Sequence, residues 1–299
     1  MKFLAAFVRA MRPQQWVKNL FVFAPILFAH ELHMGGKLLR IVATFGIFCL
    51  LSSGVYLMND VADREADRVH PRKRTRPIAS GEVGVSAAVV GAVTMIVGAL
   101  AWSHFGLGRN AATAIFATYL VIQLLYTFWL KRVVIVDVMC IASGFVLRLL
   151  AGSTAAWIEE SAWILVCTIF VSLFLALTKR RHEVVSLAGD ATAHRAILAE
   201  YPPELLDQLI GSATACTLVT YALYTVDERT IRFHHLSPAP VLAVTLPFVI
   251  FGMFRYLFLV YRRDGGGSPT TTLLRDVPLI VNGVLYVATV FAVFKFAAR

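Results

Sequence analysis

Residues 41–77 read IVATFGIFCLLSSGVYLM-NDVADREADRVHPRKRTRP, an uninterrupted apolar run (41–58) followed at once by a densely charged stretch. The apolar run has the length and composition of a membrane-spanning helix. The charged stretch therefore lies where the bilayer gives way to water, and charge concentrated at that depth is usually functional. We expect a helical membrane protein whose site begins at residue 59.

The rest of the chain has the same character. Of its 299 residues, 58% are hydrophobic and only 15% are charged, and the mean hydropathy is +0.72. These values exclude an ordinary soluble domain and predict an all-α, polytopic membrane protein built as one domain over residues 1–299. The expected membrane helices number about nine and cover roughly 19–32, 38–58, 83–104, 110–130, 134–153, 161–179, 206–226, 239–261 and 277–296.

The first of these spans and the topology need separate comment. Span 19–32 is short for a bilayer about 30 Å thick and contains Pro25, so we expect it to tilt, to break or to lie partly in the interface. It lacks a small-residue cleavage site, which favours a retained helix over a signal peptide. Most of the 28 Lys and Arg residues share one side if the N-terminus is cytoplasmic. The positive-inside rule then places the acidic stretch on the cytoplasmic face of the cell (inner or plasma) membrane.

The acidic stretch has the spacing of a metal site. If the helix continues past residue 58, Asn59, Asp63 and Asp67 follow one another at every fourth position and share one face. They span about 12 Å of helix axis, which is too far for all three to hold one ion directly, although two at a time could. Mg²⁺ is usually held by one or two carboxylates together with substrate phosphates. The stripe, with Asp60 beside it, therefore suits a magnesium diphosphate.

A second interpretation is a solvated helix end whose acids pair with Arg64 and Arg68. The basic run that follows argues against it, because Arg72, Lys73, Arg74 and Arg76 supply phosphate-binding cations beside the metal ligands.

Three further polar clusters interrupt the apolar pattern. They comprise Tyr126, Lys131, Asp137 and Arg148; Lys179, Arg180, Arg181 and Glu183; and Lys18 with Asn19 near the N-terminus. Arg148 lies inside a predicted span, so it must be a member of an ion pair or line an anion-binding cavity. Cations that end the sixth span also complement a helix dipole and anchor the topology. We expect the clusters to converge into a pocket for a magnesium-bound, multiply phosphorylated substrate, open laterally to lipid.

These segments resemble the UbiA superfamily of intramembrane transferases, through the Asn59, Asp63 and Asp67 motif, the 126–132 segment and the nine-helix pattern. The chain is most similar to the branch that transfers phosphoribosyl groups to decaprenyl phosphate in mycobacteria and relatives. Four segments carry this closer resemblance, namely 12–19, 59–81, 137–152 and 177–183.

One segment departs from the general superfamily pattern. Members that use prenyl diphosphates typically carry a second aspartate-rich motif after the sixth helix, where this chain has Lys179-Arg180-Arg181-His182-Glu183. A cationic wall in that place favours a donor with an additional phosphate monoester, such as 5-phosphoribosyl 1-diphosphate.

The resemblance implies a Mg²⁺-dependent reaction in which a polyprenyl phosphate takes 5-phosphoribosyl from 5-phosphoribosyl 1-diphosphate and releases diphosphate. The product would supply a lipid-linked pentose for cell-wall arabinan. The implied catalytic residues are Asp60, Asp63 and Asp67, with Asn59, Asp63 and Asp67 as metal ligands. The implied substrate-binding residues are Lys18, Asn19, Arg64, Arg72, Lys73, Arg74, Arg76, Tyr126, Lys131, Asp137, Arg148, Lys179, Arg180, Arg181 and Glu183.

Two alternatives stay open. The first is a prenyltransferase that moves a prenyl chain from diphosphate to an aromatic acceptor, which the missing second aspartate motif disfavours. The second is a transporter of a phosphorylated solute, although the chain shows no repeat of broken helices in two halves. Nucleic acid is not an expected partner despite the net charge of +10, because no soluble domain carries interleaved basic and aromatic residues. A homo-oligomer is compatible with the sequence.

Overall fold

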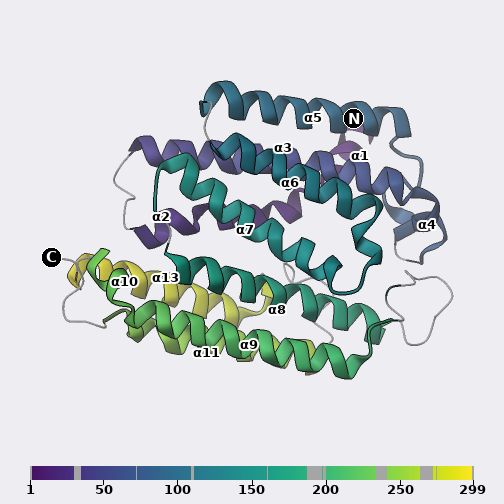
Figure 1. Cartoon of the computed structure of the whole chain (residues 1–299). Coiled ribbons are helices and arrows are strands. Elements are labelled where there is room, and N and C mark those ends of the chain that lie inside the picture. Colours follow the sequence, from purple (N-terminus) through teal and green to yellow (C-terminus); the bar gives the residue numbers. More distant parts are fainter. Residues whose placement is uncertain are drawn as a thin grey trace. The chain divides into compact units, whose positions relative to one another are not determined.

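The computed structural model describes residues 2–29, 35–71, 73–108, 111–159, 161–186, 197, 200–233, 241–262, 272–273 and 275–297. Every regular element within these ranges is a helix (Figure 1). The chain divides into two compact units, of which the first comprises Met1–Cys140 with Leu147–Glu159 and the second Ile141–Val146 with Glu160–Arg299. The expectation of one membrane domain stays a prediction.

The first unit contains the N-terminal helices, in the order α1 (Lys2–Met11), η1 (Pro13–Phe23), α2 (Ala24–Ala29), α3 (Gly35–Ala62), α4 (Arg64–Val69), η2 (Lys73–Thr75), α5 (Val85–Gly106), α6 (Ala111–Phe128) and η3 (Leu130–Arg132). Helix α7 (Val136–Ala156) contributes residues to both units. The second unit continues with α8 (Ala162–Ser186), α9 (Pro203–Val226), α10 (Glu228–Phe233), η5 (Val241–Thr245), α11 (Leu246–Arg262) and α13 (Val277–Ala297).

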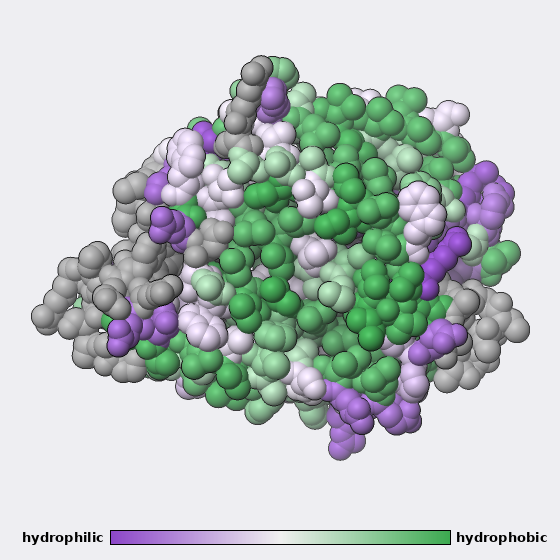
Figure 2. Space-filling model, viewed as in Figure 1, coloured by the Kyte–Doolittle hydropathy of each residue, from purple (hydrophilic) through white to green (hydrophobic). Residues whose placement is uncertain are grey.

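Eight helical segments of the described chain are long and apolar enough to cross a membrane. They lie in α3, α5, α6, α7, α8, α9, η5 with α11, and α13, and they correspond in order to the second through ninth predicted spans. The visible surface of these helices is predominantly hydrophobic (Figure 2), as lipid-facing surfaces must be. The prediction of an all-helical, multi-pass membrane protein is confirmed.

The first predicted span, 19–32, is not a long helix. Its described part consists of the end of η1, an 11-residue 3-10 helix that starts at Pro13, and the six-residue helix α2. Residues 30–34 lie outside the described ranges. A 3-10 helix of this length is unusual, and η1 packs along α3, where Trp16 Nε1 donates to Ser53 Oγ at 3.1 Å. Packing on α3 therefore decides the form of this segment.

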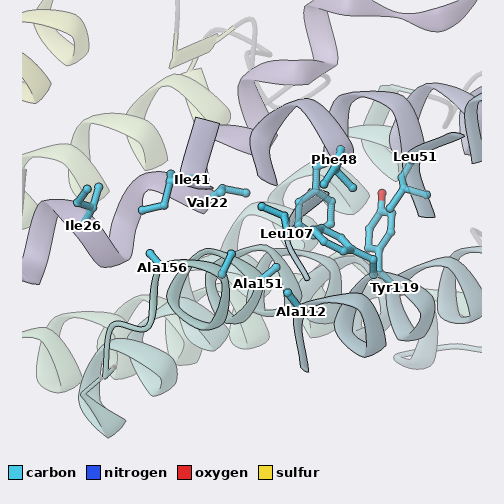
Figure 3. Close-up of a cluster of buried hydrophobic side chains, with 14 of the residues drawn as sticks. Val22, Ile26, Ile41, Phe48, Leu51, Leu107, Ala112, Tyr119, Ala151 and Ala156 are labelled. Atoms are coloured by element: carbon cyan, nitrogen blue, oxygen red, sulfur yellow. The ribbon is translucent and has the colours of Figure 1, made fainter. Parts of the chain in front are cut away.

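The core of the first unit is formed where η1, α3, α5, α6 and α7 meet (Figure 3). The ring of Phe48 packs edge-on against those of Phe116 and Tyr119, with centroids 5.0 and 5.2 Å apart. Gly152 of α7 lies against the backbone of η1, because a Cβ built there would be 2.2 Å from the Val22 carbonyl oxygen. The absence of a side chain at Gly152 lets η1 approach α7 closely.

Polar side chains tie the helices of the second unit together. The Tyr221 hydroxyl lies 2.6 Å from Thr245 Oγ1 and 3.1 Å from the Tyr286 hydroxyl, which links α9, η5 and α13. Arg255 of α11 makes two hydrogen bonds to Asp276, of 3.1 and 2.9 Å. Asp276 also accepts the backbone N–H of the third residue of α13. Such interhelical hydrogen bonds hold helices together where lipid gives no hydrophobic driving force.

Candidate functional site

The acidic motif spans the junction of α3 and α4. The N–H of Asp63 donates to the Asn59 carbonyl at 2.9 Å, and the N–H of Asp67 donates to the Asp63 carbonyl at 2.8 Å. Helical hydrogen bonding therefore continues through the motif, as the spacing predicts. The helix axis is interrupted at Asp63, between α3 and α4, where φ is −93° and ψ is 5°. This interruption lets the motif acids meet cations from different segments.

Asp60 and Asp67 are almost completely buried, with 1% and 3% of their surface exposed. Arg76 Nη1 donates to Asp67 Oδ2 at 2.6 Å and to Asp60 Oδ1 at 3.2 Å. Arg12, which follows α1, donates to the same Asp60 oxygen, and its guanidinium lies 5.0 Å from the Tyr56 ring centroid. A buried carboxylate without a partner costs several kcal/mol. These two arginines therefore make the buried position of both acids stable.

Asp63 has a different cation. Lys131 Nζ, from η3, lies 2.6 Å from Asp63 Oδ1, and the two side chains are 8% and 21% exposed. Lys131 is thus buried at the end of a membrane helix and held by a motif carboxylate. Arg64 and Arg68 contact the exposed Glu65, while Arg12, Arg76 and Lys131 pair with the other acids of the stretch. The pairing of Glu65 matches the interpretation of a solvated helix end, whereas the burial of Asp60 and Asp67 does not.

Two polar atoms beside Asp63 complete the motif. In the described part of the chain, Asn59 Oδ1 and Arg64 Nε are buried and have no hydrogen-bond partner. An unsatisfied buried acceptor and an unsatisfied buried donor each cost about 1–3 kcal/mol, so Asn59 Oδ1 is a candidate contact for a cation and Arg64 Nε for an anion. An amide oxygen next to carboxylates is a donor set that suits Mg²⁺.

The metal donors are too few for a cage made by protein alone. Across the described ranges, no three His, Cys, Asp or Glu side chains lie close enough to hold one ion. Mg²⁺ commonly takes only one or two carboxylates and completes its shell with phosphate and water. The arrangement of Asn59, Asp63 and Asp67 fits that mode.

The remaining predicted residues of the first unit lie as follows. Lys73 is half-buried in η2, Arg74 is exposed, Lys18 is half-buried on η1, Tyr126 is half-buried near the end of α6, and Asp137 is fully buried in the first turn of α7. Arg72 lies outside the described residues. Just before α7, Ile135 has φ 68° and ψ −43°, and Val136 N–H donates to Val134 O at 2.8 Å. This is a γ-turn of the rare, strained form, and it turns the chain between Lys131 and Asp137.

Arg148 lies in the core of the first unit and is 6% exposed. Its Nε donates to Asn19 Oδ1 at 2.8 Å and its Nη2 to the Tyr119 hydroxyl at 3.1 Å. Asn19 in turn donates to Cys49 and Ser52 of α3, both at 3.4 Å. Two residues that the sequence placed in separate clusters are therefore direct partners, and they join η1 to α7.

The cationic segment of the second unit lies within the last turns of α8, which continues to Ser186. Glu183 accepts from Arg180 and lies 3.6 Å from Lys179 Nζ. Arg181 Nε donates to Asp207 of α9 at 2.5 Å, and the Tyr261 hydroxyl donates to the same oxygen at 2.7 Å. The predicted convergence of this cluster with the acidic motif stays a prediction.

Arg12 is a member of the network that the sequence does not assign to the acidic motif. Its one signal in the sequence is its place in the polar segment 12–19. It adopts a left-handed conformation, with φ 55° and ψ 59°, which ends α1 and starts η1. In Figure 1, α1 and α4 lie near the same end of α3, in keeping with the contact between Arg12 and Asp60.

The chain belongs to the UbiA prenyltransferase family, which it matches over residues 20–275. It is 35% identical over 283 residues to the decaprenyl-phosphate phosphoribosyltransferase of Corynebacterium glutamicum, covering 94% of this chain and 84% of that protein. It is 33% identical over 304 residues to the enzyme of the same name from Mycolicibacterium smegmatis, covering 98% and 94%.

A solved structure shows the same fold. The UbiA homolog from Archaeoglobus fulgidus bound to GPP and Mg²⁺ superposes with a TM-score of 0.73 at 19% identity, and the match covers 97% of this chain and 99% of that one. That homolog was solved with Mg²⁺ bound, so the fold accommodates a divalent metal.

Proposed function

We propose that this protein is a membrane-bound phosphoribosyltransferase that moves 5-phosphoribosyl from 5-phosphoribosyl 1-diphosphate to a polyprenyl phosphate, of which decaprenyl phosphate is the expected form. The observation that carries the proposal is the motif network. Arg12, Arg76 and Lys131 pair with the carboxylates of Asp60, Asp67 and Asp63, and, among the described residues, Asn59 Oδ1 and Arg64 Nε are buried without a hydrogen-bond partner. The similarity to decaprenyl-phosphate phosphoribosyltransferases along nearly the whole chain supports it. The product is a lipid-linked pentose of the kind that builds cell-wall arabinan.

Asn59 and Asp63 would hold Mg²⁺, with Asp67 or Asp60 completing the set. The metal, when bound, supplies positive charge for the departing diphosphate. Lys131 and Arg64 lie directly beside these ligands, and they would bind phosphate oxygens and hold the donor in one orientation.

The acceptor needs no base from the protein. A phosphate monoester has a second pKa near 6, so the polyprenyl phosphate is ionised at neutral pH. One of its oxygens forms the bond to the anomeric carbon while the bond from that carbon to diphosphate breaks, and the electron pair leaves with diphosphate. The chain therefore has to position two anions and exclude water, which buried arginine and lysine side chains can do.

The cations of α8 are proposed to select a phosphoribosyl donor over a prenyl diphosphate. Lys179, Arg180 and Arg181 would meet the 5-phosphate of the donor, which a prenyl diphosphate lacks. The N-terminus and the motif are proposed to be cytoplasmic, because the basic segments then lie inside.

The test uses the purified, full-length protein with labelled 5-phosphoribosyl 1-diphosphate, polyprenyl phosphate and Mg²⁺, and identifies the lipid product by mass. We expect one labelled lipid and release of diphosphate. Asp63→Asn should abolish turnover while its thermal unfolding stays close to that of the wild type. Turnover of a prenyl diphosphate with an aromatic acid, and no labelled lipid, would refute the proposal.

A further inference from the structure

A cavity of about 490 Å³ lies where α1 meets η1, and it is lined by Val8, Arg9, Arg12, Pro13, Gln14 and Gln15. We propose that this cavity receives the phosphate head of the lipid acceptor from the membrane, an inference that rests on the proposed function and adds a subsite to it. The proposed ligand is a phosphate monoester joined directly to an apolar chain. The lining contains both arginines, which suit the phosphate, and apolar side chains, which suit the chain.

Helix α1 has the surface of a helix that lies in the membrane interface. Ala6 and Ala10 are 1% exposed and pack with residues of α3 and α5, whereas Leu4 and Val8 are 67% and 44% exposed. In a helix of 3.6 residues per turn, Leu4 and Val8 lie opposite the buried Ala6 and Ala10, and Arg9 and Lys2 lie on the flank between these two sides. One edge of α1 can therefore enter the acyl region while the other faces headgroups.

The cavity is lined by both apolar and basic residues. Val8 and Pro13 continue the apolar edge of α1, and Arg9 and Arg12 supply guanidinium groups that match a phosphate. A water-soluble donor has no apolar part that would need Val8 and Pro13. The lining therefore favours the acceptor, whose phosphate is attached to an isoprenoid chain.

Arg12 connects the cavity to the acidic motif. Its guanidinium donates to Asp60, and 25% of its side chain is exposed. Its left-handed backbone lets α1 end and η1 start at this one residue. A phosphate bound in this cavity would thus lie one residue from the acids that are proposed to hold the metal.

Arg9 can exchange its present partner, Glu82, for another anion. It forms an ion pair with Glu82, but 60% and 45% of these side chains are exposed, and exposed pairs contribute little to stability. A dianionic phosphate would compete with Glu82 for Arg9. Removal of either member breaks the same pair, yet the two removals should have opposite effects on lipid binding.

The experiment measures binding of labelled polyprenyl phosphate to the full-length protein in mixed micelles, without donor, so that no turnover takes place. We expect Arg9→Gln to weaken binding about tenfold, which corresponds to about 1.4 kcal/mol, and Glu82→Gln to strengthen it. Lys2→Gln removes a charge from the same helix outside the cavity, and it should change the affinity less than about twofold. Inorganic phosphate and phosphatidylglycerol should compete only weakly.

Equal weakening by Arg9→Gln and Glu82→Gln would show that the pair is structural and would overturn the proposal. Equal loss in Lys2→Gln, or full competition by phosphatidylglycerol, would indicate only general attraction to anionic lipid and would also overturn it. Competition by 5-phosphoribosyl 1-diphosphate would assign the cavity to the donor instead. Because binding is measured without turnover, a wild-type protein that binds the lipid through Arg9 but transfers no phosphoribosyl would contradict the proposed function alone.

Discussion

Replacing Lys131 by Met separates metal binding from catalysis, because the two should change in opposite directions. Lys131 Nζ lies 2.6 Å from Asp63 Oδ1, so a metal ion on that carboxylate must compete with the ammonium group. Unit charges about 4 Å apart interact by about 1 kcal/mol in water, and a divalent ion doubles that value. Lys131 and Asp63 are only 8% and 21% exposed, so the value for water is a lower bound. We therefore expect Lys131→Met to bind a divalent ion at least about 10- to 30-fold more tightly.

The measurement titrates the purified protein with Mn²⁺ in place of Mg²⁺, without donor, and follows free Mn²⁺ by electron paramagnetic resonance. Lys37→Met is the matched control, since it makes the same change at the opposite end of α3 and should leave the affinity unaltered. With donor and acceptor present, Lys131→Met should turn over more slowly, because a cation for the diphosphate is missing. Metal affinity that is unchanged or weaker in Lys131→Met would refute the assignment of Asp63.

Two further predictions concern the scaffold. Gly152→Ala would place a methyl group 2.2 Å from the Val22 carbonyl oxygen and should lower the free energy of unfolding by about 1–3 kcal/mol. The effect should be visible as a lower unfolding temperature in detergent. Gly98→Ala is the control, because Gly98 has open space around it, and it should not lower the unfolding temperature. Arg255→Met leaves Asp276 without its two hydrogen bonds and should cost about 1–3 kcal/mol. Faster amide hydrogen exchange in the first turn of α13 would confirm that effect, and unchanged exchange there would contradict it.

The long helices could be predicted from the sequence because a run of about 20 apolar residues has few alternatives in a membrane. The first span could not be predicted in the same way. Its form depends on packing between η1 and α3, and on the missing side chain at Gly152, which no local pattern reveals. The expectation that the span would tilt, break or lie in the interface rested on Pro25 and on its short length.

The motif was visible in the sequence, but its partners were not. Spacing predicted that Asn59, Asp63 and Asp67 would follow one another along a helix, and the backbone hydrogen bonds bear this out. The cation of Asp63 comes from a residue 68 positions later, and Arg12 lies 48 positions before its partner Asp60. Such pairs depend on how distant helices pack, so composition can indicate that cations exist but cannot say which acid each one meets.

The paired state of the motif has a consequence for what can enter it. Each of its buried acids already has a cation, so a lone metal ion must displace a lysine or an arginine, and a lone diphosphate must detach an arginine or a lysine from a carboxylate. A metal diphosphate supplies both replacements together, since the released cations find phosphate and the released carboxylates find metal. The motif therefore favours binding of the metal diphosphate as a whole over binding of the metal ion or of the diphosphate alone.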